Sequence, residues 1–161
     1  MKKIKYIIAI LLIVFVTGCT QVIKEEKKET KKITGDYNIG ETFSFMNFDI
    51  TIGNITGFLK IDKELSNDHG KEIFKVPISV TNKNKEAEHF SMFYYKMYNP
   101  EGKEILSKGS YYDDALDYAP DLEPNDSYDK YLYIPYEGDG SYLLEFNNFS
   151  NKVKIVLDIF K

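Results

Sequence analysis

Carboxylates crowd one stretch of the sequence, between residues 113 and 129. Hard cations such as Ca²⁺ take several oxygen ligands from a flexible loop, so this stretch could hold a calcium ion. It differs from an EF-hand, because the central glycine and the terminal glutamate of that loop are missing. A solvated acidic connection between two sheets is the simpler interpretation, and both stay open. The acidic residues are Asp113, Asp114, Asp117, Asp121, Glu123, Asp126 and Asp129, of which the first four are the candidate ligands.

Side chains of the kinds that perform catalysis are sparse. The two histidines, His69 and His89, stand in polar surroundings typical of loops or strand ends. Nucleophilic catalysis needs a base and an orienting acid beside the nucleophile. The sequence holds no Gly-x-Ser-x-Gly motif, no glycine-rich phosphate loop and no Cys/His zinc pattern. It therefore predicts solvated histidines, a protein that is not an enzyme, and no cofactor.

The single cysteine, Cys19, follows an apolar run at the N-terminus. Three lysines precede that run, which extends from Ile7 to Val16 and is too short to span a bilayer comfortably. Small residues stand before the cysteine in the sequence VTGC, which resembles a bacterial lipobox. In a lipobox the thiol forms a thioether with diacylglycerol and the chain is cut before the cysteine. A cleaved ordinary signal or a short anchoring helix is the alternative. The sequence predicts that Cys19 carries the lipid.

This interpretation divides the chain into a signal peptide (1–18), a lipidated cysteine with a charged flexible stalk (19–35) and a folded domain (36–161). The stalk lacks aromatic residues and is too polar to bury much surface, although a short solvated helix is possible there. Two acyl chains hold a protein firmly on a bilayer. The mature protein is therefore expected on the cell membrane, facing outward. Loss of three lysines would change the net charge from −4 to −7, which argues against nucleic acid.

After Gly35 apolar and polar residues alternate with a period of two, and turn residues recur. The alternation predicts an all-β fold, an Ig-like β-sandwich of about seven antiparallel strands. Pro77 lacks an N–H group, so it indicates an edge strand or a bulge. Strands are predicted over residues 48–52, 73–82, 90–98, 127–136, 141–146 and 152–159. The core should place Val76, Ile78 and Val80 opposite Val153, Ile155 and Leu157.

Aromatic residues are abundant, with 13 tyrosines and 11 phenylalanines but no tryptophan. Tyr95, Tyr131 and Tyr133 are candidates for an exposed patch that binds a protein or a glycan. The alternative is that they are half-buried sandwich tyrosines whose hydroxyl groups stay in water.

Several of these segments fall in an ordered pattern. A Y-x-I-G-E-x-F opening at 37–43 precedes V-x-I-x-V-x-N-K at 76–83, N-P-E-G-K at 99–103 and L-E-P-N-D at 122–126. Residues 36–160 thus resemble the small Ig-like extracellular domains of unknown function found on Gram-positive lipoproteins, which are grouped with mycobacterial immunoprotective extracellular proteins. That family usually has Pro-Gly where this chain has Pro124-Asn125, and asparagine also tolerates positive φ. The resemblance implies a sandwich fold and carries no catalytic residue across.

Together these features predict a monomeric, lipid-anchored protein that binds an envelope or extracellular protein without catalysing a reaction. The alternative is a ligand- or calcium-binding accessory lipoprotein that uses residues 113–129.

Overall fold

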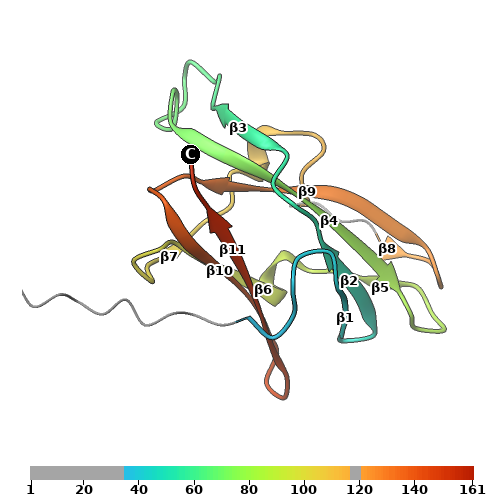
Figure 1. Ribbon diagram of the computed structural model, residues 1–161. Helices are drawn as coiled ribbons and strands as arrows, with labels where there is room; N and C mark the ends of the chain where they lie inside the picture. The colour runs from blue at the N-terminus through green and yellow to red at the C-terminus, as the bar shows by residue number, and fades with distance from the viewer. Residues whose placement is uncertain (1–34, 117–120) are drawn as a thin grey trace, which may run out of the picture. The chain divides into compact units, whose positions relative to one another are not determined.

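Alternating side chains build two packed antiparallel sheets and a small two-stranded ribbon (Figure 1). The computed structural model describes residues 35–116 and 121–161, which all belong to one unit, Lys32–Lys161. The predicted lipobox, the stalk before Gly35 and Asp117 lie outside the described residues. Within the described ranges, no helix is long and apolar enough to cross a bilayer.

The first sheet is organised around β4 (Glu72–Asn82), whose side chains mostly alternate between buried and half-buried. β9 (Ser127–Pro135) pairs along one edge of β4. β2 (Phe48–Ile52) and β3 (Gly57–Lys60) follow one another along the other edge. β1 (Thr42–Phe45) pairs with the outer side of β2. β4 is therefore a central strand.

The second sheet supplies the other half of the sandwich, and two short 3-10 helices lie in the connections. Its strands, in spatial order, are β11 (Lys152–Ile159), β10 (Gly140–Asn147), β6 (Tyr95–Tyr98) and β7 (Glu104–Ile105). The ribbon pairs β5 (Glu88–His89) with β8 (Asp121–Leu122), and the 3-10 helices are η1 (Met92–Tyr94) and η2 (Gly109–Tyr111). In the turn before β9, Asn125 has a φ of 66°, so it takes the conformation usual for glycine.

The inward side chains of the two large sheets form one hydrophobic cluster, which we call the inter-sheet core. β4 contributes Val76, Ile78 and Val80, and β11 contributes Val153, Ile155 and Leu157, none of them more than 5% exposed. The predicted all-β antiparallel sandwich is confirmed, and so is this pairing of faces across it. The strand predicted over 90–98 begins only at Tyr95, because η1 occupies the preceding residues.

Pro77 lies opposite a break between β2 and β3. The Gly53 N–H donates to the Pro77 carbonyl (2.8 Å), so the Pro77 nitrogen faces a point where neither strand pairs with β4. A Cβ atom on Gly53 would lie 3.0 Å from the Pro77 ring, so a larger residue there would require the ring to shift by a few tenths of an ångström. β4 runs through Pro77 without a break, and the irregularity lies instead in the chain between β2 and β3, where residues 53–56 face Val76 and Pro77. The edge position is wrong, because β4 is paired along both edges.

Residues 106–116, which follow β7, fold back over the outer face of the first sheet; we call this segment the strap. Beneath it lies a second, smaller group of buried side chains, which we call the outer cluster: Ile61, Ile73, Ala115 and Tyr133. Tyr111, Tyr112 and Tyr131 pack against this group. The strap is therefore only partly solvated, in contrast to the solvated connection predicted for its acidic end.

Candidate functional site on the outer face of the first sheet

Lys75 lies among residues from two separate predictions, the calcium site and the aromatic patch. It occupies an outward position of β4, and its partner in the antiparallel register is Tyr133 of β9. Tyr131 lies two residues before Tyr133 and also faces outward, because side chains alternate along a strand. The strap brings Asp114 to the same place. One of the proposed calcium ligands thus lies among two of the proposed aromatic residues.

The Lys75 ammonium group contacts two side chains, one of which is bonded in turn to Tyr133. Its Nζ atom lies 2.7 Å from Asp114 Oδ2 and 3.6 Å from the centroid of the Tyr131 ring. The Tyr133 hydroxyl donates to Asp114 Oδ1 at 2.5 Å. Tyr112, on the strap, stacks on Tyr133 with 4.0 Å between ring centroids. The cation is therefore held both by a carboxylate and by the face of an aromatic ring.

Hydrogen bonds that involve backbone atoms fasten the strap to β9 as well. The Tyr131 N–H donates to the Asp114 carbonyl (3.1 Å), and the Lys108 N–H donates to the Tyr133 carbonyl (2.8 Å). Lys130 Nζ reaches the carbonyl of Asp113 (3.3 Å). The position of Asp114 is therefore set by contacts of its own carbonyl and of the residues before it, in addition to its own side-chain bonds.

The electrostatics of this group favour the ionic forms of Asp114 and Lys75. Burial works to raise the pKa of Asp114, but hydrogen bonds from Lys75 and Tyr133 outweigh it and hold that pKa below its ordinary value. Burial works to lower the pKa of Lys75, yet the bond to Asp114 leaves it raised. Burial, followed by the Asp114 carboxylate, raises the pKa of Tyr133 to about 12. At neutral pH the group is a clamp made of an ion pair and a protonated tyrosine.

A second ionic group ties the strap to the loop between β3 and β4. Asp68 accepts from Lys108 Nζ and from Lys71 Nζ, each at 2.7 Å, and from the Tyr111 hydroxyl at 3.1 Å. Tyr111 also shares a hydrogen bond with Ser66 (2.7 Å). The hydrogen bond from Lys108, followed by that from Lys71, holds the pKa of Asp68 well below its usual range.

The described candidate calcium ligands are not brought together. Asp114 already accepts hydrogen bonds through both carboxylate oxygens. Asp121 is exposed in the β5–β8 ribbon, where it lies 3.3 Å from His89 Nδ1. In the part of the chain that the structure describes, no three His, Cys, Asp or Glu side chains are grouped to hold a metal ion. His69 and His89 are both exposed, as expected.

The prediction of an exposed aromatic patch is wrong for two of its three tyrosines. Tyr133 does face outward, but the strap covers it and leaves 2% of it exposed. Tyr95 faces inward and packs in the inter-sheet core, 5.8 Å from the Phe146 ring. Tyr131 is half-buried, at the border between the strap and open surface.

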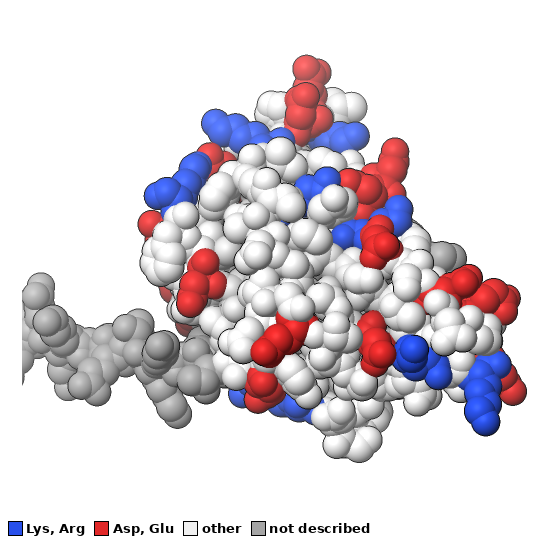
Figure 2. Space-filling model, turned by 45° about the vertical axis from the view of Figure 1, so that its right-hand side comes forward, with Lys and Arg blue, Asp and Glu red and all other residues white. Residues whose placement is uncertain are grey.

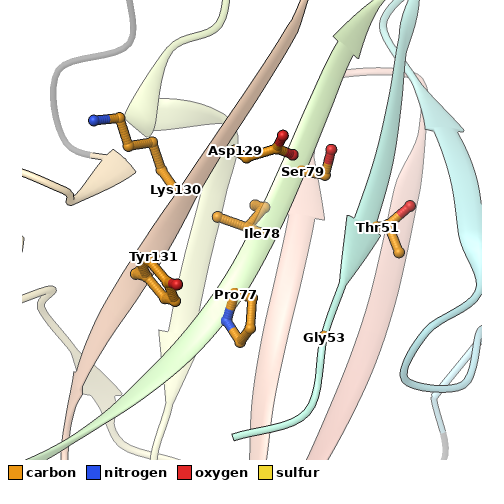
Figure 3. Close-up of a pocket in the computed structure, with 8 residues that line it drawn as sticks. All are labelled: Thr51, Gly53, Pro77, Ile78, Ser79, Asp129, Lys130 and Tyr131. Carbon is orange, nitrogen blue, oxygen red and sulfur yellow. The ribbon is translucent and has the colours of Figure 1, made fainter. Parts of the chain in front are cut away.

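Beside Tyr131 the outer face of the sheet is hollowed into a groove of about 210 Å³. Figure 3 shows the Tyr131 ring and Pro77 at one end, Asp129 and Ser79 at the other, and Thr51 across from them. The groove lies at the break between β2 and β3, where Gly53 adds no side chain. In the sequence, Pro77 was the only indication of an irregularity near this groove.

Neither sign of charge dominates the surface drawn in Figure 2, where acidic and basic side chains intermix around a largely uncharged centre. A surface of this kind has no extended field of one sign to attract a polyanion.

A second hollow, of about 440 Å³, lies at the end of the sandwich where η1, the β1–β2 turn and the β10–β11 hairpin meet. Met46, Phe93, Tyr94 and Phe149 line it, and we call this surface the apolar end. Sequence reasoning missed it because its residues belong to turns and a 3-10 helix, outside the alternation. A usable signal was Phe149 itself, an aromatic residue among Asn and Ser in a turn.

A family model described as a domain of unknown function, DUF4352, matches residues 37–155. The chain belongs to the DUF4352 family. No curated protein matches this DUF4352 chain. The resemblance to a family of domains of unknown function is confirmed at this level, whereas the closer grouping with immunoprotective extracellular proteins stays a prediction.

Two solved structures from Bacillus subtilis resemble this DUF4352 domain in fold. The yjhA protein aligns with a TM-score of 0.56 at 13% identity, over 76% of this chain and 99% of that one. The protein ycdA from strain 168, which is named as a candidate lipoprotein, aligns with a TM-score of 0.56 at 15% identity. That alignment covers 73% of this chain but 38% of ycdA. At these identities the likeness shows the fold alone.

Proposed function

We propose that this protein is a lipid-anchored, surface-exposed module that binds an envelope or extracellular protein through the outer face of its first sheet, without catalysis. The observation that carries the proposal is the open groove beside Tyr131. Its volume of about 210 Å³ suits one or two side chains of a protein partner, since small-molecule pockets are usually larger, at about 300–1,000 Å³.

The walls of the groove suit a protein partner for a second reason. Tyr131 is held by Lys75, at 3.6 Å from its ring, and by its backbone bond to Asp114. Binding would therefore restrict little additional motion of that ring. Tyrosine is also enriched among the residues that dominate binding energy at protein interfaces. Thr51, Ser79 and Asp129 supply the polar groups that such an interface needs around an apolar contact.

Membrane attachment rests on the N-terminal sequence. The basic residues, the apolar run and the sole cysteine behind a small residue support acylation of Cys19. The naming of ycdA, a structural neighbour, as a candidate lipoprotein is consistent with that placement.

The electrostatics of Lys75, Asp114 and Tyr133 are unlike those of an acid–base catalyst. A general base or an activated lysine works best when its pKa is shifted toward neutral pH. Lys75 and Asp114 are shifted away from neutrality, and Tyr133 is shifted to about 12. The alternative function, calcium binding by residues 113–129, is less well supported because Asp114 is already engaged by Lys75 and Tyr133.

Site-specific photocrosslinking in intact cells tests the proposed face. The full chain would carry benzoylphenylalanine in place of Tyr131, and a matched variant would carry it in place of Tyr98, a half-exposed tyrosine of the second sheet. We expect a discrete protein adduct at position 131 and none at position 98. No adduct at 131, or equal adducts at both positions, would contradict the proposal.

Two further measurements separate the remaining parts of the proposal. Cys19→Ala should release the protein from the membrane fraction or leave it unprocessed, as read by detergent-phase partitioning and intact mass. A calcium titration should leave the melting temperature unchanged. A saturable rise that Asp113→Ala with Asp114→Ala abolishes would instead favour the calcium-binding alternative.

A further inference from the structure

The apolar end presents its most exposed aromatic side chains at two uncharged tips. Phe149 is fully exposed at the tip of the β10–β11 hairpin, and Phe93 is 87% exposed on η1. Residues 146–151, FNNFSN, and residues 90–95, FSMFYY, contain no charged residue. Both tips border the same hollow of about 440 Å³. Lys96 also lines this hollow, and its ammonium group is paired with Glu104 at 2.9 Å.

In each tip a side chain satisfies part of the backbone's hydrogen-bond donors. The Asn148 side-chain oxygen accepts from the N–H groups of Ser150 (3.0 Å) and Asn151 (2.6 Å). In the same way, the Ser91 hydroxyl oxygen accepts from the N–H of Phe93 (3.2 Å). Contact with a poorly hydrated medium is costly for unpaired N–H groups, so this arrangement lowers the cost of placing the two tips there.

The described chain begins at this end of the sandwich. The Asp36 N–H donates to the Lys154 carbonyl (2.7 Å), and Tyr37 bridges to Ile155 in parallel. Residues 36–37 therefore run in the same direction as β11, starting near the hairpin that carries Phe149. Figure 1 shows this blue start beside the lower part of β10 and β11.

The chain between Cys19 and Gly35 is short. Its 16 residues, 19–34, reach about 55 Å at full extension. Residues 20–34 hold five lysines and three glutamates, so they favour an anionic surface. A lipid on Cys19 would keep the domain within that reach of the bilayer, and the described chain enters the domain at the apolar end.

Leu65, the other apolar side chain that is fully exposed in the described ranges, has different surroundings. It lies in the loop between β3 and β4, at the opposite end of β4 from the β1–β2 turn. Its neighbours in sequence include Asp62, Lys63 and Glu64. Charged neighbours resist transfer out of water, so this loop is unsuited to a lipid surface.

From these contrasts we infer that the apolar end rests on the lipid bilayer, with Phe149 and Phe93 inserted at the headgroup boundary. This inference rests on the lipid attachment of the proposed function and deepens it. It leaves the groove beside Tyr131 on a side face of the sandwich, clear of the membrane and open to a protein partner. Aromatic side chains on uncharged tips are well suited to the interface, where an apolar body can leave water beside polar headgroups.

Tryptophan fluorescence tests the inference, because the chain contains no tryptophan. Phe149→Trp and the matched control Leu65→Trp each place one fluorophore at a fully exposed site. The full chain, purified from the membrane fraction, is reconstituted in vesicles of phosphatidylcholine and phosphatidylglycerol, with and without phosphatidylcholine brominated on its acyl chains. We expect a blue-shifted emission at position 149 and quenching several times greater than at position 65. Phe93→Trp should behave like Phe149→Trp.

Equal quenching at positions 149 and 65 would overturn the inference and leave the apolar end to a protein partner. Intact mass of the same preparation reports separately on Cys19. If the chain is acylated and the quenching is equal, the proposed lipid anchor is supported but the proposed orientation on the bilayer is wrong. If the chain is not acylated and is recovered as a soluble protein, it is mixed with the same vesicles. Selective quenching at 149 would then support the orientation although the anchor had failed, and equal quenching would again overturn it.

Discussion

The inter-sheet core and the outer cluster both bury isoleucine and tyrosine, but they are closed in different ways. Two sheets close the inter-sheet core, and its residues come mainly from the inward positions of long strands. The outer cluster is closed by the strap together with the loop between β3 and β4, above outward positions of β4 and β9. Polar bonds hold that strap: Asp114 to Lys75 and Tyr133, and Asp68 to Lys108.

This difference implies two levels of stability in one domain. Removing apolar volume from the inter-sheet core should destabilise the whole fold, because both sheets depend on it. Breaking the polar bonds of the strap should open a local segment and leave the sandwich intact. The predictions below follow this contrast from the largest expected effect to the smallest.

Ile78→Ala should lower the free energy of unfolding by about 2 to 5 kcal/mol, because it leaves a cavity between the sheets. Ile78 is 1% exposed in the inter-sheet core. Denaturant unfolding followed by far-ultraviolet circular dichroism measures the loss. Ser79→Ala, at the adjacent outward position, is the control and should change stability little. Equal losses in the two variants would mean that β4 faces the other way.

Lys75→Met should cost about 1 to 2 kcal/mol, through the lost charge-assisted bond to Asp114 and the lost contact with the Tyr131 ring. Methionine keeps most of the apolar stem. Amide hydrogen exchange should speed up at the Tyr131 N–H, which donates to Asp114. If exchange instead rises by the same factor at Ile78 and Tyr131, the strap and the sandwich unfold together and the contrast fails.

Tyr133→Phe should cost about 1 kcal/mol, since it removes one hydrogen bond and keeps the ring stacked on Tyr112. Tyr98→Phe is a matched control on the second sheet, where the tyrosine is only half-buried. The urea concentrations at which the two variants are half unfolded measure the two losses of stability. A loss at position 98 as large as that at position 133 would show that the Asp114 bond contributes nothing specific.

The smallest effect should be a dependence on pH. The pKa of Asp114 is lowered in the folded state, so its contribution is present above the unfolded value of about 3.9 and is lost as pH falls through the folded value. The carboxylate is 45% exposed, and water therefore limits the contribution to less than about 1 kcal/mol. Wild type should be more stable than Asp114→Asn at pH 7 and at pH 5, and the difference should shrink at pH 3. If the stability advantage of wild type over Asp114→Asn is larger at pH 3 than at pH 7, the direction assigned to the Asp114 pKa shift is wrong.

The contrast between the inter-sheet core and the outer cluster also explains which features could be predicted from the sequence. Alternation predicts Val76, Ile78 and Val80 correctly, because within a strand the period alone decides which side chains share a face. It also places Ile73 and Tyr133 on the outward face, but it cannot show that the strap covers them. That cover depends on contacts such as Lys75 with Asp114, 39 residues apart. Tyr95 was misjudged because η1 delays the start of β6.

The exposed aromatic residues escaped prediction for another reason. Phe93 and Phe149 stand in segments without strand periodicity, so no pattern assigns them a face. Their exposure follows from local turns in which Ser91 and Asn148 bind the backbone. Such bonds can be suspected from Ser and Asn in turns, but the position of the turns at one end of the sandwich depends on the whole fold.

The pairing of β4 with β9 has a kinetic consequence. Thr81 and Ser127, which face each other in this pair, are 46 residues apart along the chain. The entropy of closing so long a loop must be overcome before the pairing contributes any stability. Folding should therefore be slow for a domain of this size, in the millisecond-to-second range of all-β proteins. Until β9 has been synthesised, one edge of β4 has no partner, and that edge is where a nascent chain would be most prone to associate with another copy.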